Sequence, residues 1–114
     1  MEDCVFCDII EGKMSGKIVY QDEDVIALED IGPQAPVHIL VMPKKHIPTL
    51  LDLTEDDEKL IGKIVLVANE IATKYNIGKN GFRIVFNCNK DAGQSVPHIH
   101  MHLMGGRRFA WPPG

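Results

Sequence analysis

Three histidines occupy alternate positions of one short segment, His98, His100 and His102, with Ile99 and Met101 between them. Alternate side chains of an extended strand point to the same face, so this spacing predicts three imidazoles on one face and apolar side chains on the other. The outer two would lie about 13 Å apart at ~3.3 Å per residue. All three cannot bind one zinc ion, whose bonds to nitrogen measure about 2.0 to 2.1 Å. The three histidines therefore have different tasks.

An imidazole is well suited to attack a phosphate ester or a phosphoramidate. Its ordinary pKa is about 6.5, and attack through the neutral nitrogen gives a labile phosphoryl-type intermediate. One ring nitrogen must be free, while an acceptor holds the other as N–H. His100 has a histidine on either side and is the predicted nucleophile. The preceding Gly93-Gln94-Ser95 could bind an anion through backbone N–H groups and a hydroxyl, although such a segment is more often only a turn.

One long helix, one short helix and about five strands are predicted to position these residues. Apolar residues repeat with a helical period from Thr54 to Tyr75, and Thr54 with Asp57 forms a capping box. A shorter helical turn is predicted over Val5–Glu11. Strands are predicted over Ile18–Gln21, Val25–Asp30, His38–Met42, Gly81–Cys88 and His98–Met104. Short connections favour antiparallel pairing of the strands, so the predicted fold class is α+β. The long helix can cover only one face of the sheet, and we expect solvent, a ligand or a second copy of the chain on the other face.

Length and composition indicate one globular domain over residues 1–114. The chain is 45% hydrophobic and 25% charged, and its net charge of -4 leaves no basic field for nucleic acid. No apolar run reaches the ~20 residues that span a membrane, and the acidic Met1-Glu2-Asp3 is unlike a basic leader. Three cysteines are too few for a disulfide framework, which favours a reducing compartment. We expect a cytoplasmic protein.

The segment His98–Met104 fits the alternating signature of the histidine triad (HIT) superfamily, and Asp91–Ser95 is similar to the segment before it in that family. Further matches are Asp30-Ile31, Pro33–Pro36, His38, Val41–His46, Gly105–Arg107 and the ending Trp111–Gly114. The resemblance covers essentially the whole chain. It is greatest to the histidine triad nucleotide-binding proteins of the purine nucleoside phosphoramidase branch. It implies a HIT-like α+β fold whose five-stranded sheet continues across a homodimer.

The resemblance also implies a reaction, hydrolysis of the P–N bond in AMP-amine or AMP-lysine adducts. His100 would form a covalent nucleotidyl-histidine, His102 would contact the phosphate, Ser95 would lie near the phosphate and leaving group, and His38 would support the nucleophile through hydrogen bonds. The implied nucleotide-binding residues are Asp30 at the ribose, Ile31 near the base, and Asn87, Gly93, Gln94 and Ser95 at the phosphate. Alternatives are a dinucleoside polyphosphate hydrolase or nucleotidyl transferase of the same superfamily, or a zinc- and nucleotide-binding regulatory module.

Cys4 and Cys7 form a C-x-x-C, which alone is ambiguous between a redox pair, a zinc site and chance. No thioredoxin-like context follows the pair, which disfavours a redox role. Once the resemblance assigns the other histidines to the reaction, His46 and His98 remain to complete a Cys2His2 site, and many bacterial relatives bind zinc with this set. Structural zinc is therefore expected, with free thiols as the alternative. Cys88 has no partner at metal spacing and is expected to be a small packed residue.

Overall fold

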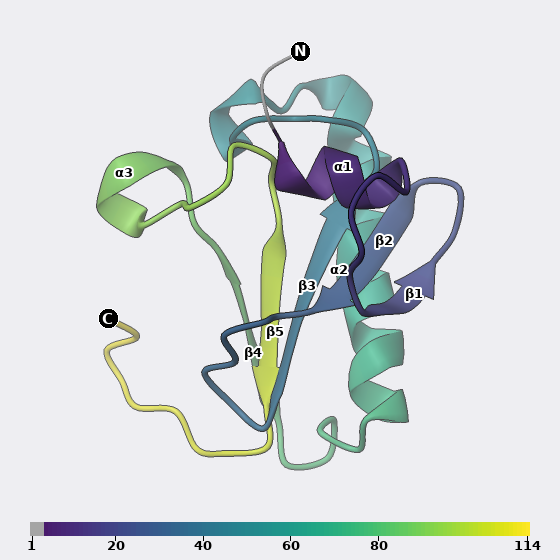
Figure 1. Cartoon of the computed structure of the whole chain (residues 1–114). Helices are drawn as coiled ribbons and strands as arrows, with labels where there is room; N and C mark the ends of the chain where they lie inside the picture. Colours follow the sequence, from purple (N-terminus) through teal and green to yellow (C-terminus); the bar gives the residue numbers. More distant parts are fainter. Residues whose placement is uncertain (1–3) are drawn as a thin grey trace.

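The framework is a five-stranded antiparallel sheet with the strand order β1-β2-β3-β5-β4. The computed structural model describes residues 4–114 (Figure 1); the acidic N-terminal residues 1–3, on which the expectation of no leader depends, lie outside this range. The helices and strands are α1 (Val5–Ile10), β1 (Ile18–Gln21), β2 (Val25–Glu29), β3 (Val37–Pro43), η1 (Leu50–Asp52), η2 (Glu55–Asp57), α2 (Glu58–Lys74), β4 (Phe82–Phe86), α3 (Asn89–Ala92) and β5 (Met101–Gly105). The α+β class with five antiparallel strands is confirmed.

The last strand of the chain lies in the middle of the sheet. β5 pairs with β3 on one side and with β4 on the other, and both pairings are antiparallel. His38 of β3 is opposite Met104, and Leu40 is opposite His102. His38 and His102 are therefore diagonal neighbours on one face, within reach of each other's side chains.

The long helix α2 covers the opposite face. Its buried residues Ile64, Ala68 and Ile71 pack with Ile39 of β3 and Leu103 of β5 in the larger of two hydrophobic clusters. The predicted amphipathic pattern is thus confirmed, although α2 itself begins at Glu58. The predicted capping box of Thr54 and Asp57 is present, and it caps the short 3-10 helix η2 that leads into α2.

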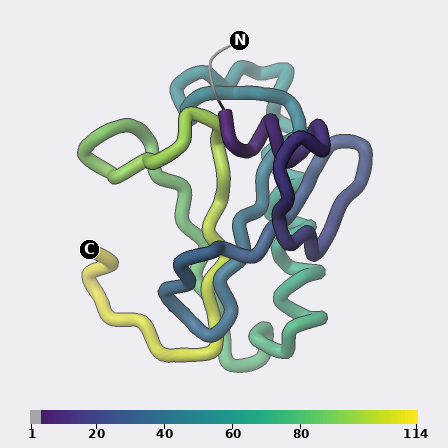
Figure 2. The backbone as a smooth tube through the Cα atoms, viewed as in Figure 1, coloured from purple at the N-terminus to yellow at the C-terminus, as the bar shows by residue number. Residues whose placement is uncertain are grey.

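The short helix α1 covers part of the other face. Cys4, Phe6 and Cys7 are buried there against Ile26, Leu28, Leu40 and Met42 of β2 and β3. The C-terminal tail runs on the β4 side of the sheet (Figure 2). Arg83 of β4 donates a hydrogen bond to the carbonyl of Ala110 (3.1 Å). The protein's own α1 therefore covers part of the face for which we expected solvent, a ligand or a second copy.

One predicted strand boundary was wrong, and one short helix was not predicted. The strand predicted from His98 begins only at Met101, because β3 ends at Pro43 and the N–H of Ile99 bonds instead to the carbonyl of Ile47 (2.7 Å). Residues 89–92, for which the sequence predicted no regular element, form the one-turn helix α3. Gly93 ends it with a left-handed φ of 81°, a conformation that glycine adopts without steric cost. Of the residues described, none belongs to a helix long and apolar enough to cross a membrane.

Candidate active site and metal centre

A cavity of about 490 Å³ opens between α1, the end of β2, the middle of β3 and the histidine segment. Five of the predicted site residues line it together, namely Asp30, Ile31, Ser95, His100 and His102. Most of the remaining wall is apolar, and sequence reasoning did not identify it: Phe6, Ile9, Leu28, Leu40 and Val96. The i, i+3 spacing of Phe6 and Ile9 on a short helix was the available signal. The cavity combines an apolar wall with a polar floor that carries two imidazoles.

His100 has the protonation pattern that a nucleophile requires. Its Nδ1 donates to the backbone carbonyl of His98 at 2.8 Å, so the lone pair is on Nε2. The ring is 6% exposed, and Phe6 packs against it edge-on with a centroid distance of 5.0 Å. Phe6 and the His98 carbonyl together restrict the orientation of the ring. The spatial arrangement therefore matches the role predicted for His100.

The His38–His102 pair has a definite direction of proton donation. The N–H of Gln34 donates to Nδ1 of His38 at 3.0 Å, so neutral His38 carries its proton on Nε2. That nitrogen lies 2.9 Å from Nδ1 of His102 and 3.4 Å from a carboxylate oxygen of Asp30. Because Nδ1 of His102 accepts this bond, neutral His102 carries its own proton on Nε2. His102 is thus prepared to donate a hydrogen bond in the cavity.

Burial keeps both imidazoles of this pair neutral. It lowers the pKa of His102 to about 4, and the neighbouring His100 and His38 lower it further. Burial also lowers the pKa of His38, although the charge of Asp30 opposes this change. A buried cation is costly because it loses its hydration, and at both histidines this cost outweighs the attraction of the Asp30 carboxylate.

Three potential metal ligands lie close together near the cavity, namely Asp30, His38 and His102. The hydrogen bond from the N–H of Gln34 argues against a metal ion at these three residues. It requires Nδ1 of His38 to be the acceptor, so the proton of neutral His38 is on Nε2, the nitrogen that faces Asp30 and His102. A metal ligand must offer a lone pair at that position. We therefore interpret the three residues as a hydrogen-bond relay.

A second cluster has the geometry of a tetrahedral metal site. The Nδ1 atom of His98 lies 3.5 Å from Sγ of Cys4, 3.6 Å from Sγ of Cys7 and 3.3 Å from Nδ1 of His46. Sγ of Cys7 and Nδ1 of His46 are 3.2 Å apart. A zinc tetrahedron with the usual bond lengths has S···N edges of about 3.5 Å and N···N edges of about 3.4 Å. The four predicted ligands therefore fit such an ion.

The surroundings of these four residues support the same interpretation. Nε2 of His98 donates to the carbonyl of Pro43 at 2.7 Å, which leaves the lone pair of Nδ1 facing the other three donors. The His98 ring is fully buried. Burial, together with Cys4, raises the pKa of the Cys7 thiol to about 11, so a nearby cation is needed to stabilise a thiolate at neutral pH.

Three predicted phosphate ligands do not line the cavity. Asn87 follows β4, and Gly93 ends α3. The side-chain NH2 of Gln94 donates to the carbonyls of Pro48 (2.6 Å) and Val96 (2.9 Å), so this side chain connects its own loop to the loop that contains Pro48. The phosphate-binding roles of these three residues stay predictions. Cys88 is partly buried and makes no disulfide.

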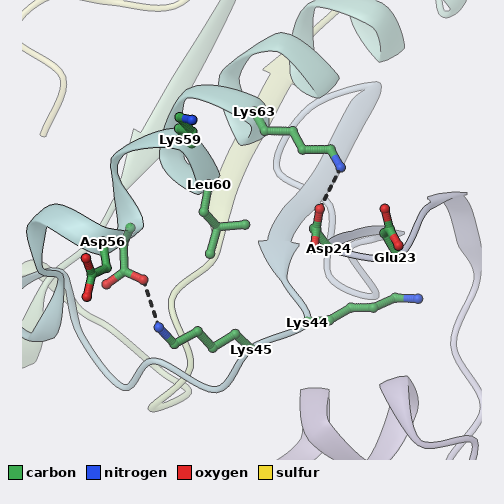
Figure 3. Close-up of a pocket in the computed structure, with 9 residues that line it drawn as sticks. Glu23, Asp24, Lys44, Lys45, Asp56, Lys59, Leu60 and Lys63 are labelled. Atoms are coloured by element: carbon green, nitrogen blue, oxygen red, sulfur yellow. Dashed lines mark hydrogen bonds and ion pairs between the residues drawn. The ribbon is translucent and has the colours of Figure 1, made fainter.

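Another cleft, of about 430 Å³, lies between the β1–β2 turn, the end of β3 and the start of α2 (Figure 3). Four lysines and four acidic residues line it together with Leu60. Lys45 pairs with Asp57 at 2.9 Å, and Lys63 pairs with Asp24 at 3.0 Å. Its charges balance and neither imidazole nor thiol reaches it, so it is a poorer candidate for catalysis.

In this α+β fold, an imidazole with a free nitrogen lies beside the N–H of a second imidazole, and both line a cavity with an apolar wall. This combination is typical of the histidine triad class of proteins. The HIT domain model matches residues 11–109, and the chain belongs to the HIT family. It is 45% identical to an uncharacterized HIT-like protein of Synechocystis over 99% of this chain and 98% of that one.

Solved structures agree with this assignment. A HIT family hydrolase from Legionella pneumophila superimposes with a TM-score of 0.96 at 45% identity, covering 98% of this chain and 100% of that chain. A histidine triad nucleotide-binding protein from Candida albicans superimposes with a TM-score of 0.82 at 26% identity, covering 96% and 83%.

Proposed function

We propose that the protein binds a purine nucleotide and hydrolyses the P–N bond of nucleoside 5'-phosphoramidates of the AMP-amine or AMP-lysine type. The observation that carries this proposal is the hydrogen bond from Nδ1 of His100 to the carbonyl of His98, which leaves Nε2 free in a cavity that Asp30 also lines. The names of the Legionella hydrolase and the Candida nucleotide-binding protein support the two halves of the proposal.

The proposed reaction has two displacements at phosphorus. Nε2 of His100 attacks, the P–N bond breaks, and the leaving nitrogen takes a proton from the Ser95 hydroxyl or from water to depart as an amine. Water then attacks the nucleotidyl-histidine and gives its proton to the Ser95 oxygen, or to solvent where water protonated the amine, and the nucleotide leaves with His100 and Ser95 regenerated. The Nε2–H of His102 donates to a non-bridging phosphate oxygen, where negative charge develops in both steps.

The cavity wall provides a place for the nucleoside. Phe6, Ile9 and Leu28 would pack against the faces of the base, and Asp30 would accept hydrogen bonds from the ribose hydroxyls. Ile31 is completely exposed at the cavity and would gain an apolar contact when a base binds. Net acidity is no obstacle, because binding depends on local N–H groups rather than overall charge.

A substrate panel tests this proposal. We expect turnover of adenosine 5'-phosphoramidate and of an AMP-lysine adduct, with a nucleotidyl-enzyme of increased mass after rapid acid quench. Turnover confined to dinucleoside polyphosphates, or transfer of the nucleotide to an acceptor, would favour the other enzymes of the superfamily. Nucleotide binding with no turnover of any adduct would favour a regulatory module.

We further propose that Cys4, Cys7, His46 and His98 hold a structural zinc ion. Two thiolates and two imidazoles form a complete tetrahedral set for this metal, which would supply the positive charge that the thiolates need. A thiolate site suits a reducing compartment and supports a cytoplasmic location. Metal analysis after anaerobic purification is expected to give one zinc per chain, and metal-free protein that is fully folded would contradict the proposal.

We also propose a homodimer in which the sheet continues from one protomer to the other. β4 lies at the edge of the sheet and pairs with β5 alone among the described strands. Ile84 of β4 is 40% exposed and Leu66 of α2 is 68% exposed, so both offer apolar surface to a partner. Sedimentation should give twice the mass of the chain, and Ile84→Lys should shift the mass toward that of a monomer.

A further inference from the structure

Hydrogen bonds connect the C-terminal tail to the imidazole pair through one residue, Gln34. Nε of Arg107 donates to the carbonyl of Gln34 at 3.0 Å, and the N–H of Gln34 donates to Nδ1 of His38 at 3.0 Å. His38 then bonds to His102 at 2.9 Å. The N–H and the carbonyl belong to the two peptide groups that meet at the Cα of Gln34, so a side chain that holds the carbonyl restrains this Cα and, through it, the position of the N–H.

We propose that Arg107 is a positioning residue for the reaction, which keeps the Gln34 N–H on His38 and thereby keeps the Nε2–H of His102 available to the phosphate. This inference rests on the proposed function and adds a residue outside the cavity to it. Arg107 does not line the cavity that holds His100 and His102. Its effect is transmitted through the backbone of Gln34, where two adjacent peptide groups share one Cα.

Tautomer chemistry explains why the position of the Gln34 N–H matters. Without the N–H of Gln34, Nδ1 of His38 can carry the proton, and its Nε2 would then present a lone pair to Nδ1 of His102 and to the carboxylate of Asp30. Facing lone pairs repel, so the pair relaxes by moving the proton of His102 to Nδ1 or by rotating a ring. Either change removes the N–H donor from the phosphate side of His102.

Arg107 is held in place by several independent contacts. Its guanidinium lies over the ring of Phe109, 4.3 Å from the centroid, and one of its terminal nitrogens donates to the carbonyl of Arg108 at 2.9 Å. Gly106 has a φ of 90°, and a Cβ there would come within 2.9 Å of Pro36. A side chain at Gly106 would therefore push the tail away from the segment that contains Gln34.

Two further hydrogen bonds close to Gln34 lie within residues 30–34. The side chain of Gln34 donates to the carbonyl of Gly32 at 3.0 Å, and the N–H of Gly32 donates to Asp30 at 2.8 Å. Within residues 4–114, Arg107 is the one side chain from outside the segment 30–38 that bonds to the backbone of Gln34. Its guanidinium is thus the external support for the backbone at Gln34.

The test compares Arg107→Gln with Arg108→Gln. Arg108 is adjacent and exposed, carries the same charge, and its side chain makes no hydrogen bond or ion pair to any residue in the described range. We expect Arg107→Gln to lower kcat on adenosine 5'-phosphoramidate by about tenfold, with KM changed less than about twofold, since loss of a charge-assisted hydrogen bond has an effect of this order. Arg108→Gln should leave both constants unchanged.

The second readout needs no substrate. The ¹⁵N shifts of labelled histidine, recorded at about pH 8 where imidazoles are neutral, distinguish protonated Nδ1 from protonated Nε2. His38 should be in the Nε2–H form in the wild type and in Arg108→Gln, and a mixture of forms in Arg107→Gln. If Arg107→Gln does not fold, Arg107→Lys replaces it, because lysine keeps the charge and lacks the planar Nε–H.

An unchanged His38 tautomer in folded Arg107→Gln would overturn the inference, as would a wild-type kcat. Equal losses in the two arginine variants would also overturn it, because they would reflect charge alone. Absence of turnover in the wild type would contradict the proposed function instead, and the tautomer comparison would still decide the role of Arg107.

Discussion

The backbone carbonyl of His98 accepts a hydrogen bond from Nδ1 of His100 at 2.8 Å, while the imidazole of His98 lies among the thiols of Cys4 and Cys7. One residue therefore takes part in both sites, with its backbone in the candidate active site and its side chain in the candidate metal centre. Phe6 makes a second connection, because it lies between the two cysteines in the chain and packs against the ring of His100. Changes at the metal centre should reach the nucleophile through both routes.

Replacing the nucleophile should abolish turnover. His100→Ala and His100→Asn are expected to lower kcat on an adenosine phosphoramidate by about 10³-fold or more, since no other described group offers the free nitrogen in the cavity. AMP binding, measured by calorimetry, should persist in at least one variant. Turnover that is unchanged in either variant would contradict a covalent role for His100.

Asp30→Asn should weaken nucleotide binding more than it slows the chemical step. A carboxylate accepts two hydrogen bonds from a ribose diol, whereas an amide offers one acceptor, so Kd for AMP should rise by about tenfold. Glu29→Gln is a suitable control, because Glu29 lines the same cavity and pairs with Lys17 at 2.9 Å. A similar loss in both variants would show that general charge rather than ribose contact determines affinity.

Metal removal should lower both the free energy of unfolding and the rate of catalysis. Cys7→Ser, or chelation of the purified protein, is expected to lower the free energy of unfolding by roughly 4 kcal/mol, as loss of a buried metal site does. Thermal unfolding and zinc content are measured together, and Cys88→Ser serves as the control because this thiol belongs to neither site. Because His98 bonds to His100, the folded metal-free protein should also have a lower kcat. A melting temperature insensitive to chelation would refute a structural metal.

Stability should fall on acidification because of His102. Its pKa is lowered to about 4 in the folded protein, against the ordinary value near 6.5. Between these pH values the unfolded chain binds a proton that the folded protein excludes, so the free energy of unfolding decreases as the pH falls, by at most about 1.4 kcal/mol per pH unit. Denaturant titrations from pH 7 to pH 4 measure this slope. His102→Gln should make it shallower, and an equal slope in wild type and variant would assign the dependence to other groups.

Local signals in the sequence predicted much of the fold. Alternating apolar residues located the strands from Ile18 to Met42, and the helical period located α2 to within a few residues, because both patterns extend over many positions. The break at His98–His100 was missed, since the sequence alone does not reveal that Ile99 would bond to Ile47. The prediction that His98 and His102 have different tasks is consistent with their different partners.

The site was harder to predict than the fold. Resemblance to a family supplied the roles of His38 and His102, but the direction of proton donation depends on the N–H of Gln34, a backbone group that no residue pattern identifies. The apolar wall of the cavity was missed for a similar reason. A six-residue helix such as α1 has little intrinsic preference for one orientation, and tertiary packing alone turns Phe6 toward His100.

The central position of β5 determines when the molecule can become functional during synthesis. β4 has no hydrogen-bonded neighbour in the described sheet until β5 pairs with it, whereas β1, β2 and β3 can pair early because they are adjacent in the chain. His98 of the candidate metal centre and His100, the proposed nucleophile, immediately precede this last strand. A chain released from the ribosome before residue 98 would therefore hold two unliganded thiols and an open sheet, and neither site could assemble from it.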